Sequence, residues 1–484
     1  MSFSKNRLVS EFVSAMQNGE AALFIGAGMS RPAGFVDWKG LLRDCAEEIG
    51  LNLDREHDLV AVAQYYINSR IDRARLNQVL KREFDKSYRP TINHSIISRL
   101  PIRNIWTTNF DTLIEDAIRH SGKKIEVISN DSQIAIPTSG RDVMLYKMHG
   151  DIADPSKIII CKNDYENYSK EHELFQNQLS VELVSKTFLF LGFSFSDPNL
   201  NYMLGHLRSL LSDKNKRAHY AIMRKTRLNW HMENKKEAEE IHAYDINRQN
   251  LHVQDLKRYS INTTLVDDYD EVTKILECIE KANQLKNVFV SGSAHVFDEY
   301  GEEKIREFCF NLGRALIKSD YKIITGMGLN IGDTLVKGAI LELHQMDKNN
   351  IEQNLLIRPF PKYLGNEFEE QKIHDKIRTD MISKSGIAVI ISGTSRTSKI
   401  SAGVMREYEM ARQQGKYIIP VGVTGYAAKH IWEIMQPEID RHYDNKVSSE
   451  IYRRLNDSTI DSNQLIEVVL SIANKVSNST GCYN

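Results

Sequence analysis

The chain has 484 residues, of which 41% are hydrophobic and 26% charged, and its formal net charge is −1. This length predicts two or three domains, and the composition is typical of globular proteins. The near-neutral charge argues against a nucleic-acid-binding protein, and no apolar run approaches the roughly 20 residues that span a bilayer. We therefore expect no nucleic-acid partner, no membrane partner and a cytoplasmic location.

The first half of the chain has the pattern of a parallel sheet wrapped by helices. Short apolar runs that end in small or polar residues alternate there with amphipathic stretches of helical periodicity. The charged, proline-free stretch 227–267 is expected to form a helix followed by an irregular connector. The expected strands are 21–25, 104–107, 143–148, 187–192 and 219–223, and the expected helices are 38–49, 59–84, 112–120, 174–185 and 199–211.

The first of these strands runs into the turn Gly26-Ala27-Gly28-Met29-Ser30. Its glycines permit a tight turn, and a helical pattern follows from about Asp37. Backbone amides at such a junction can bind an anion, and the partial positive charge of a helix N-terminus assists them. The turn is therefore a candidate pyrophosphate site of a dinucleotide, with a plain tight connection as the alternative.

Three further segments place polar side chains at the ends of expected strands. Because the carboxyl ends of parallel strands meet at one edge of a sheet, these side chains are expected beside the first turn, where ligands bind in open α/β sheets. The segments are Trp106-Thr107-Thr108-Asn109-Phe110-Asp111, Tyr146-Lys147-Met148-His149-Gly150-Asp151 and Leu189-Phe190-Leu191-Gly192-Phe193-Ser194-Phe195-Ser196-Asp197.

Together, in this order, the turn and the three segments resemble the sirtuin (SIR2) family, whose signature is a Gly-Ala-Gly-x-Ser turn, a Thr-x-Asn-x-Asp segment and a His-Gly pair. The resemblance implies that the domain binds NAD and cleaves its nicotinamide–ribose bond. It implies two catalytic residues: Asn109, which would hold a ribose hydroxyl or a water, and His149, the general base. The NAD-binding residues that it implies are Gly26, Ala27, Gly28, Ser30, Asp37, Asp111, Gly192 and Ser194.

Structural alternatives remain for two of these residues. Asp111 is expected to orient its neighbours or to cap the next helix. A lone histidine such as His149 is often a buried residue satisfied by the backbone.

The segment after the His-Gly pair departs from the family. Protein-deacylating sirtuins carry four zinc-binding cysteines there, whereas residues 151–186 contain only Cys161, so we expect no metal. Without a zinc-supported groove for an acyl-lysine peptide, water is the favoured nucleophile, and the expected reaction is hydrolysis of NAD to nicotinamide and ADP-ribose. The alternatives are an NAD-dependent protein deacylase with a C-terminal ligand-binding domain and a scaffold that binds NAD or ADP-ribose.

A second α/β pattern follows, which predicts two consecutive doubly wound (Rossmann-like) parallel-sheet domains, 1–283 and 284–484. Strands are expected at 287–290, 321–324, 354–358, 386–392 and 416–421. The second domain resembles the SLOG group of nucleotide-handling proteins, but the glycine-rich turn of its phosphoribohydrolase members is not intact here. We therefore expect a sensor, in which Arg378 would pair with phosphate and Glu407 would accept ribose hydroxyls, with a surface ion pair as the alternative. The implied ligand-binding residues are Gly292, Ser293, Gly326, Gly328, Arg378, Lys399 and Glu407.

The order of a SIR2-like and a SLOG domain resembles the NAD-consuming effectors of the Thoeris antiphage defence system. That resemblance implies a partner with a TIR domain that makes a cyclic ADP-ribose variant, which the SLOG domain binds to switch on NAD depletion. It also implies a homo-oligomer, a tetramer built through the SIR2-like domains.

Overall fold

The computed structural model describes residues 2–478, apart from positions 36–37, 71, 85, 87, 136–138, 196, 211–216, 229–233, 298–299, 349 and 362–365. The chain forms two compact units, Met1–Glu280 and Lys281–Asn484. The division falls within helix α13 (Tyr269–Leu285), whereas the sequence predicted a boundary after residue 283. None of the described helices is both long enough and apolar enough to cross a membrane.

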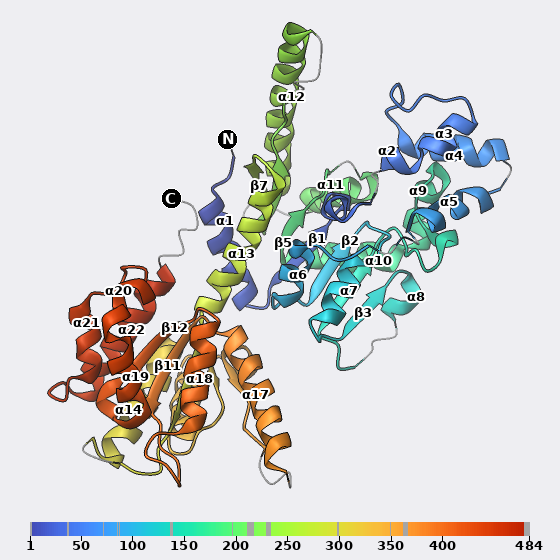
Figure 1. Ribbon diagram of the computed structural model, residues 1–484. Helices are drawn as coiled ribbons and strands as arrows, with labels where there is room; N and C mark the ends of the chain where they lie inside the picture. The colour runs from blue at the N-terminus through green and yellow to red at the C-terminus, as the bar shows by residue number, and fades with distance from the viewer. Residues whose placement is uncertain are drawn as a thin grey trace. The chain divides into compact units, whose positions relative to one another are not determined.

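The first unit is built on a parallel sheet of seven strands in the order β3-β4-β2-β1-β5-β6-β7 (Figure 1). Five of the seven strands were expected. The edge strands β3 and β7 were not, and β7 lies where an irregular connector was predicted. The strands are β1 (Ala21–Ile25), β2 (Asn104–Thr107), β3 (Ile125–Ile128), β4 (Val143–Lys147), β5 (Thr187–Leu191), β6 (His219–Arg224) and β7 (Ile261–Val266).

One face of this sheet is covered by α9 (Lys162–Glu171), α10 (Glu173–Ser185) and α11 (Pro198–Leu210). Buried aromatic residues of the strands pack against these helices, among them Phe24, Trp106, Tyr146, Phe188 and Phe190. Helix α1 (Lys5–Gln17) packs against β1 and β5, and α6 (Ile92–Arg99) packs against α7 (Leu113–His120). The long helix α12 (Lys235–Leu256) precedes β7.

A small helical module stands between β1 and β2 in the sequence. It contains α2 (Trp38–Leu41), α3 (Arg43–Glu48), α4 (Leu59–Arg70) and α5 (Ala74–Phe84), so the single helix expected over 59–84 is two helices. The module has its own apolar cluster, which also includes Phe110, Ile158, Ile160 and Cys161 from the loops after β2 and β4. Its core therefore extends to the edge of the sheet where the candidate site residues lie.

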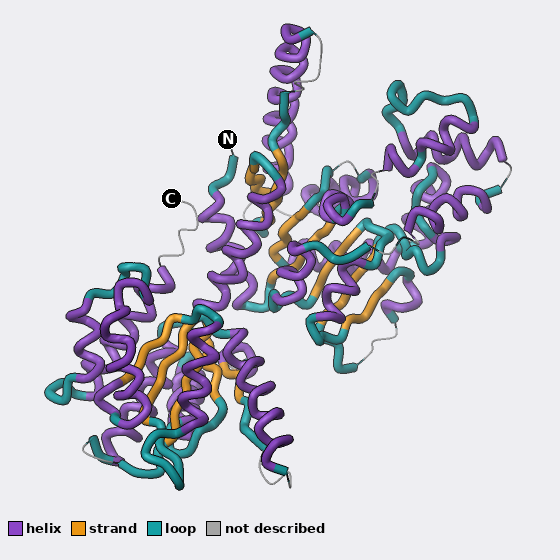
Figure 2. The backbone as a smooth tube through the Cα atoms, in the orientation of Figure 1, coloured by secondary structure: helices purple, strands orange, loops and turns teal. Residues whose placement is uncertain are grey.

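The second unit contains a parallel sheet of five strands in the order β10-β9-β8-β11-β12, and each of the five was expected (Figure 2). Helix α14 (Glu302–Lys318) packs against both α15 (Gly332–Gln345) and α22 (Ser462–Asn478), and α17 (Glu367–Lys384) packs against α18 (Ala402–Gln413). Helix α19 (Tyr426–Met435) packs against the last two strands. The strands are β8 (Asn287–Ser293), β9 (Lys322–Thr325), β10 (Leu355–Ile357), β11 (Ile387–Ser392) and β12 (Tyr417–Val421).

Candidate active site

Four neighbouring strands of the first unit end level with one another. Ile25 of β1 pairs with Thr107 of β2 and with Leu191 of β5, and Thr107 pairs with Lys147 of β4. The loops that carry the glycine turn, Asn109, His149 and Gly192 therefore leave the same edge of the sheet. Strand β1 lies at the point where the strand order reverses, which is where ligands bind in open α/β sheets.

The glycine turn is packed against the loop after β5. The amide groups of Gly26 and Gly28 donate hydrogen bonds to the carbonyl oxygens of Leu191 and Gly192, both at 2.9 Å. A Cβ atom on Gly28 would lie 2.8 Å from the Gly192 carbonyl oxygen, so only glycine permits this approach. A short 3₁₀ turn, Ala27–Met29, follows, and the first α-helix after it begins at Trp38. The amides of Gly26 and Gly28 are therefore bonded within the protein, and the contact of this turn with NAD stays a prediction.

Asn109 is held in a buried chain of hydrogen bonds. Its backbone amide donates to Oγ1 of Thr107 at 3.0 Å, and its side-chain Nδ2 donates to Oγ of Ser30, also at 3.0 Å. The Ser30 hydroxyl has a single proton, which it donates to Oδ2 of Asp111 at 2.7 Å, so it must accept from Asn109. The Asn109 side chain is 5% exposed, and its Oδ1 atom has no hydrogen-bond partner among the described residues.

Asp111 also fixes the start of the next helix. Its Oδ1 atom accepts a hydrogen bond from the backbone amide of Leu113 at 3.1 Å, at the first residue of α7. Ser30 and Asp111 thus orient Asn109 and anchor the loop that carries it. Both residues were expected to bind NAD, and the structure gives them internal partners, which for Asp111 is the orienting role expected as its alternative.

His149 faces a carboxylate from the loop after β5. Its Nε2 atom lies 3.1 Å from Oδ2 of Asp197, close enough for an ion pair when the ring is protonated, although the contact is not aligned as a hydrogen bond. The other oxygen of Asp197 accepts from the amide of Leu200 at 2.9 Å, which fixes it at the start of α11. Burial alone would raise the pKa of Asp197, but the contacts with His149 hold that pKa below its ordinary value.

The second ring nitrogen of His149 indicates a chemical role in addition to packing. His149 is 3% exposed, and its Nδ1 atom has no hydrogen-bond partner in the described part of the chain. The ring of Tyr165 stands edge-on to the imidazole at 5.6 Å between centroids, and its hydroxyl lies 3.4 Å from Asp197. A buried histidine can act as a general base when a carboxylate orients its ring and one ring nitrogen has no hydrogen-bond partner within the protein.

Three expected NAD-binding positions remain. Asp37 lies outside the described residues. Ser194 is exposed in the loop after β5, and Gly192 has a φ of +62°, a backbone conformation that favours glycine. No group of three or more His, Cys, Asp or Glu side chains among the described residues is arranged to hold a metal ion.

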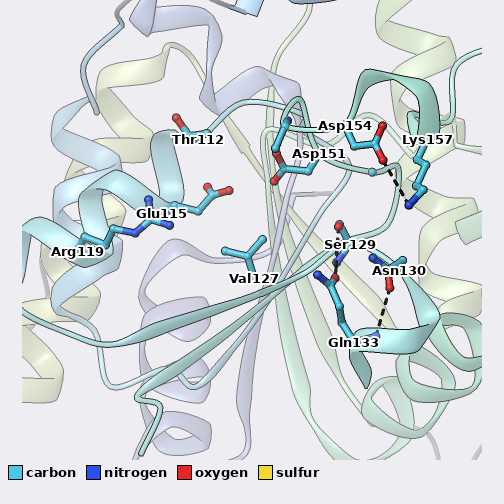
Figure 3. Close-up of a pocket in the computed structure, with 12 residues that line it drawn as sticks. Thr112, Glu115, Arg119, Val127, Ser129, Asn130, Gln133, Asp151, Asp154 and Lys157 are labelled. Atoms are coloured by element: carbon cyan, nitrogen blue, oxygen red, sulfur yellow. Dashed lines mark hydrogen bonds and ion pairs between the residues drawn. The ribbon is translucent and has the colours of Figure 1, made fainter. Parts of the chain in front are cut away.

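A cavity of about 450 Å³ opens at the carboxyl ends of β3 and β4 (Figure 3). Figure 3 shows Glu115 and Asp151 reaching toward each other from α7 and from the loop after β4. The lining of the cavity includes residues from the start of α7, from the loop after β3 and from the loop after β4: Thr112, Glu115, Ser129, Asn130, Gly150 and Asp151.

In the second unit, the loop after β9 approaches the end of β8 and the loop after β10 very closely. A Cβ atom on Gly328 would lie 1.8 Å from the carbonyl oxygen of Gly292, and one on Gly326 would lie 2.5 Å from the Phe360 ring. Ser293 donates from its hydroxyl to the carbonyl of Thr394 at 2.7 Å, across the point where the strand order reverses between β8 and β11. These glycines are explained by packing, so their place in a ligand site stays a prediction.

Arg378 and Glu407 form a buried contact, not the surface ion pair that was the alternative. Both residues are 6% exposed, and Nε of Arg378 lies 3.4 Å from a carboxylate oxygen of Glu407, whose other oxygen accepts from Ser291. Nη1 of Arg378 donates to Asp375 at 3.1 Å, and Nη2 has no partner among the residues that the structure describes. Burial raises the pKa of Glu407, although Ser291 and Arg378 oppose this shift. Lys399 is exposed in the loop after β11.

Comparison with known proteins agrees with both halves of this description. Residues 103–247 match the family model described as SIR2-like domain, and residues 271–476 match the one described as Sir2- and TIR-associating SLOG family. The chain is 37% identical to NAD(+) hydrolase ThsA of Bacillus cereus (strain MSX-D12), over 97% of this chain and 98% of that protein. The chain belongs to the ThsA family of NAD(+) hydrolases.

Two further proteins are similar to this chain, one over nearly its whole length and one over part of it. NAD(+) hydrolase ThsA of Acinetobacter baumannii (strain 532279) is 36% identical over 96% of this chain and 97% of its own length. Defense-associated sirtuin 2 of Bacillus subtilis is 29% identical over 42% of this chain and 21% of its own length. The expected order of a SIR2-like and a SLOG domain, and the expected membership in the NAD-consuming Thoeris effectors, are confirmed.

Two residues beside the candidate site of this ThsA family member were not singled out from the sequence. Asp197 precedes Pro198 at the start of a helix, and the helix-capping pattern could have drawn attention to it. Lys147 is a charged residue at the end of an otherwise apolar strand, which is an unusual position for lysine. Their contacts link segments distant in the sequence, so the sequence pattern alone does not reveal their partners.

Proposed function

We propose that this chain hydrolyses NAD to nicotinamide and ADP-ribose, with Asn109 and His149 as its catalytic residues. The observation that supports this most directly is the pair of buried polar groups at the ends of β2 and β4. Asn109 keeps an unpartnered oxygen, and His149 faces the carboxylate of Asp197. Buried polar atoms without partners are rare in folded proteins, and they are expected where a substrate completes the hydrogen bonds. Membership in the ThsA family supplies the substrate class.

The chemistry follows from the charge that builds on the ribose. As the bond between the anomeric carbon and the nicotinamide nitrogen breaks, nicotinamide leaves with the electron pair and the ribose carbon becomes positive. Oδ1 of Asn109 accepts a hydrogen bond from a ribose hydroxyl or from the water that attacks this carbon. His149 takes the proton that the water loses on forming the new C–O bond, and a positioned base of this kind typically contributes about 10²–10⁴-fold.

Asp197 stabilises the charged histidine that forms in this step. Its pKa lies below the ordinary aspartate value, so the carboxylate is ionised at neutral pH and can pair with the imidazolium. Because one oxygen is fixed at the start of α11, the carboxylate also fixes the orientation of the ring. The turn at Gly26–Ser30 and the loop with Gly192 and Ser194 are the proposed walls of the NAD site.

The second unit is the proposed control site. We propose that it binds a cyclic ADP-ribose-type messenger made by a TIR-domain protein, and that this binding switches on NAD depletion in antiviral defence. Nη2 of the buried Arg378 is a charged donor that could donate a hydrogen bond to a phosphate oxygen. The match to a family described as TIR-associating supports a TIR-domain partner. A cytoplasmic homotetramer is part of the same proposal.

The experiment is to incubate the purified full chain with NAD in H₂¹⁸O, with and without cyclic ADP-ribose isomers, and to follow nicotinamide release. The expected result is slow release alone, fast release with one isomer, and ADP-ribose that carries ¹⁸O. No nicotinamide release under any of these conditions would contradict NAD hydrolysis. Release only with an acylated lysine peptide, yielding acylated ADP-ribose, would support the deacylase alternative.

A further inference from the structure

Lys147, the last residue of β4, is fully buried. Its side chain is 0% exposed, and lysine is almost never fully buried unless its charge is paired. Here Nζ lies 2.7 Å from Oε1 of Glu115 and 2.8 Å from Oδ2 of Asp151. Burial alone would lower the pKa of Lys147, but the two carboxylates raise it above the ordinary lysine value, so the side chain is an ammonium group.

The same ammonium group also binds the backbone beside Asn109. Nζ donates to the carbonyl oxygen of Asp111 at 2.7 Å and to that of Phe110 at 3.1 Å. The Phe110 carbonyl also accepts from the backbone amide of Ile152 at 3.2 Å. Phe110 and Asp111 directly follow Asn109, whereas Asp151 and Ile152 follow His149 by two and three residues. Lys147 therefore joins the two loops that carry the proposed catalytic residues.

A stability role alone does not account for this group. Replacing a buried ion pair by apolar side chains of similar volume is often neutral or stabilising, because burial of charge costs so much. The network is also incomplete, because Oε2 of Glu115 is buried without a hydrogen-bond partner among the described residues. What an apolar side chain could not reproduce is the set of directed contacts between the two loops.

We propose that Lys147 is a positioning residue, whose ammonium group sets the placement of Asn109 relative to His149. The inference rests on the proposed NAD hydrolysis at these two residues. Lys147 itself is sealed from the site and touches no substrate. Misplacement of catalytic groups by about 1 Å can cost about 100-fold in rate, so loss of the ammonium group should act mainly on kcat.

The test compares variants that differ in whether the ammonium group is present. K147M/E115M removes the fully buried pair and leaves only the partly exposed carboxylate of Asp151 without its cation, and E115Q keeps the ammonium group with its two carbonyl contacts. We expect kcat for nicotinamide release to fall about 100-fold in K147M/E115M, with KM changed less than about threefold and a melting temperature near that of wild type. E115Q should keep kcat within about fivefold of wild type.

Two further variants make the outcome decisive. K123M is the matched lysine control. Nζ of Lys123 donates to the Leu100 carbonyl oxygen at 2.7 Å, and neither residue belongs to these loops, so the kcat of K123M should not change. D151N removes the direct tether to the His149 loop, and its carboxylate is 15% exposed, so it should fold even if the double variant does not. We expect D151N to lower kcat about tenfold.

A folded K147M/E115M or D151N protein with wild-type kcat would overturn the positioning role while leaving NAD hydrolysis in place. Equal loss of kcat in E115Q and in the double variant would also overturn it, because the ammonium group would not be the cause. A wild-type protein that releases no nicotinamide would instead contradict the proposed function, and this inference with it.

Discussion

The hydroxyl of Ser30 accepts a hydrogen bond from Nδ2 of Asn109 at 3.0 Å. Because the same hydroxyl donates to Asp111, the Asn109 amide is fixed with its nitrogen toward Ser30 and its oxygen away from it. Ser30, the last residue of the glycine turn after β1, therefore orients Asn109 in the loop after β2 through its side chain. This relationship assigns Ser30 a role in orienting Asn109, where the sequence predicted a direct contact with NAD.

The S30A variant tests that role. Without the hydroxyl, the Asn109 amide loses its partner and can rotate, so kcat for nicotinamide release should fall about tenfold, the equivalent of about 1.4 kcal/mol. Steady-state kinetics with NAD measure it. S10A is the control, because the Ser10 hydroxyl bonds only to its own helix on the exposed face of α1. Unchanged kcat in S30A would contradict this role.

The D197N variant tests the pairing of His149. The amide keeps the size of the carboxylate but cannot stabilise an imidazolium, so kcat should fall by about 100-fold or more. The control is D267N, which removes an exposed ion pair with Lys225 in the same unit. If D197N and D267N showed equal rates across the pH range, the general-base role of His149 supported by Asp197 would be wrong.

The E407Q variant tests the burial of Glu407 through pH. Burial raises the pKa of Glu407, so the folded state favours the protonated carboxyl group. The stability that this proton contributes is fully present below the ordinary glutamate pKa of about 4.3, and it is lost as the pH rises through the raised pKa. Between pH 4.5 and 7.5, the melting temperature of wild type should therefore drop relative to that of E407Q. Differential scanning fluorimetry of the full chain, with the exposed E409Q as control, measures this difference. If the difference in melting temperature between wild type and E407Q stayed constant over this pH range, the pKa of Glu407 would not be raised.

The R378Q variant tests the second unit. If Nη2 of Arg378 binds a phosphate oxygen, loss of the charge should weaken binding of the stimulating cyclic ADP-ribose isomer by at least about 30-fold, or about 2 kcal/mol. Isothermal titration calorimetry gives the Kd directly. K376Q, an exposed residue of the same helix, should bind as wild type does. Wild-type affinity in R378Q would place the ligand elsewhere.

The sequence predicted the positions of the strands better than the partners of the site residues. Apolar runs with polar ends located β1, β2, β4 and β5, and with them Asn109 and His149. The edge strand β7 was missed because it follows a long charged helix and two threonines, Thr263 and Thr264, interrupt its apolar run. An edge strand needs fewer apolar residues than a central one, so its pattern is weaker.

The contacts of the glycine turn show a different limit. The sequence predicts that this turn holds an anion, whereas the amides of Gly26 and Gly28 bond to the end of β5 and the loop after it. Both arrangements need residues without side chains, so the sequence cannot distinguish them. In the same way, the pairing of His149 with Asp197 and of Lys147 with Glu115 depends on the fold of segments distant in the chain.

The most direct test of the account is single-turnover nicotinamide release by N109A and H149A, measured with saturating NAD and the cyclic ADP-ribose isomer that stimulates wild type most. Asn109 holds the ribose hydroxyl or the attacking water, and His149 takes the proton of that water, so each variant should lose at least about 100-fold in rate while its melting temperature stays close to that of wild type. Folded N109A and H149A proteins that release nicotinamide as fast as wild type would contradict the central claim that these two residues carry the reaction.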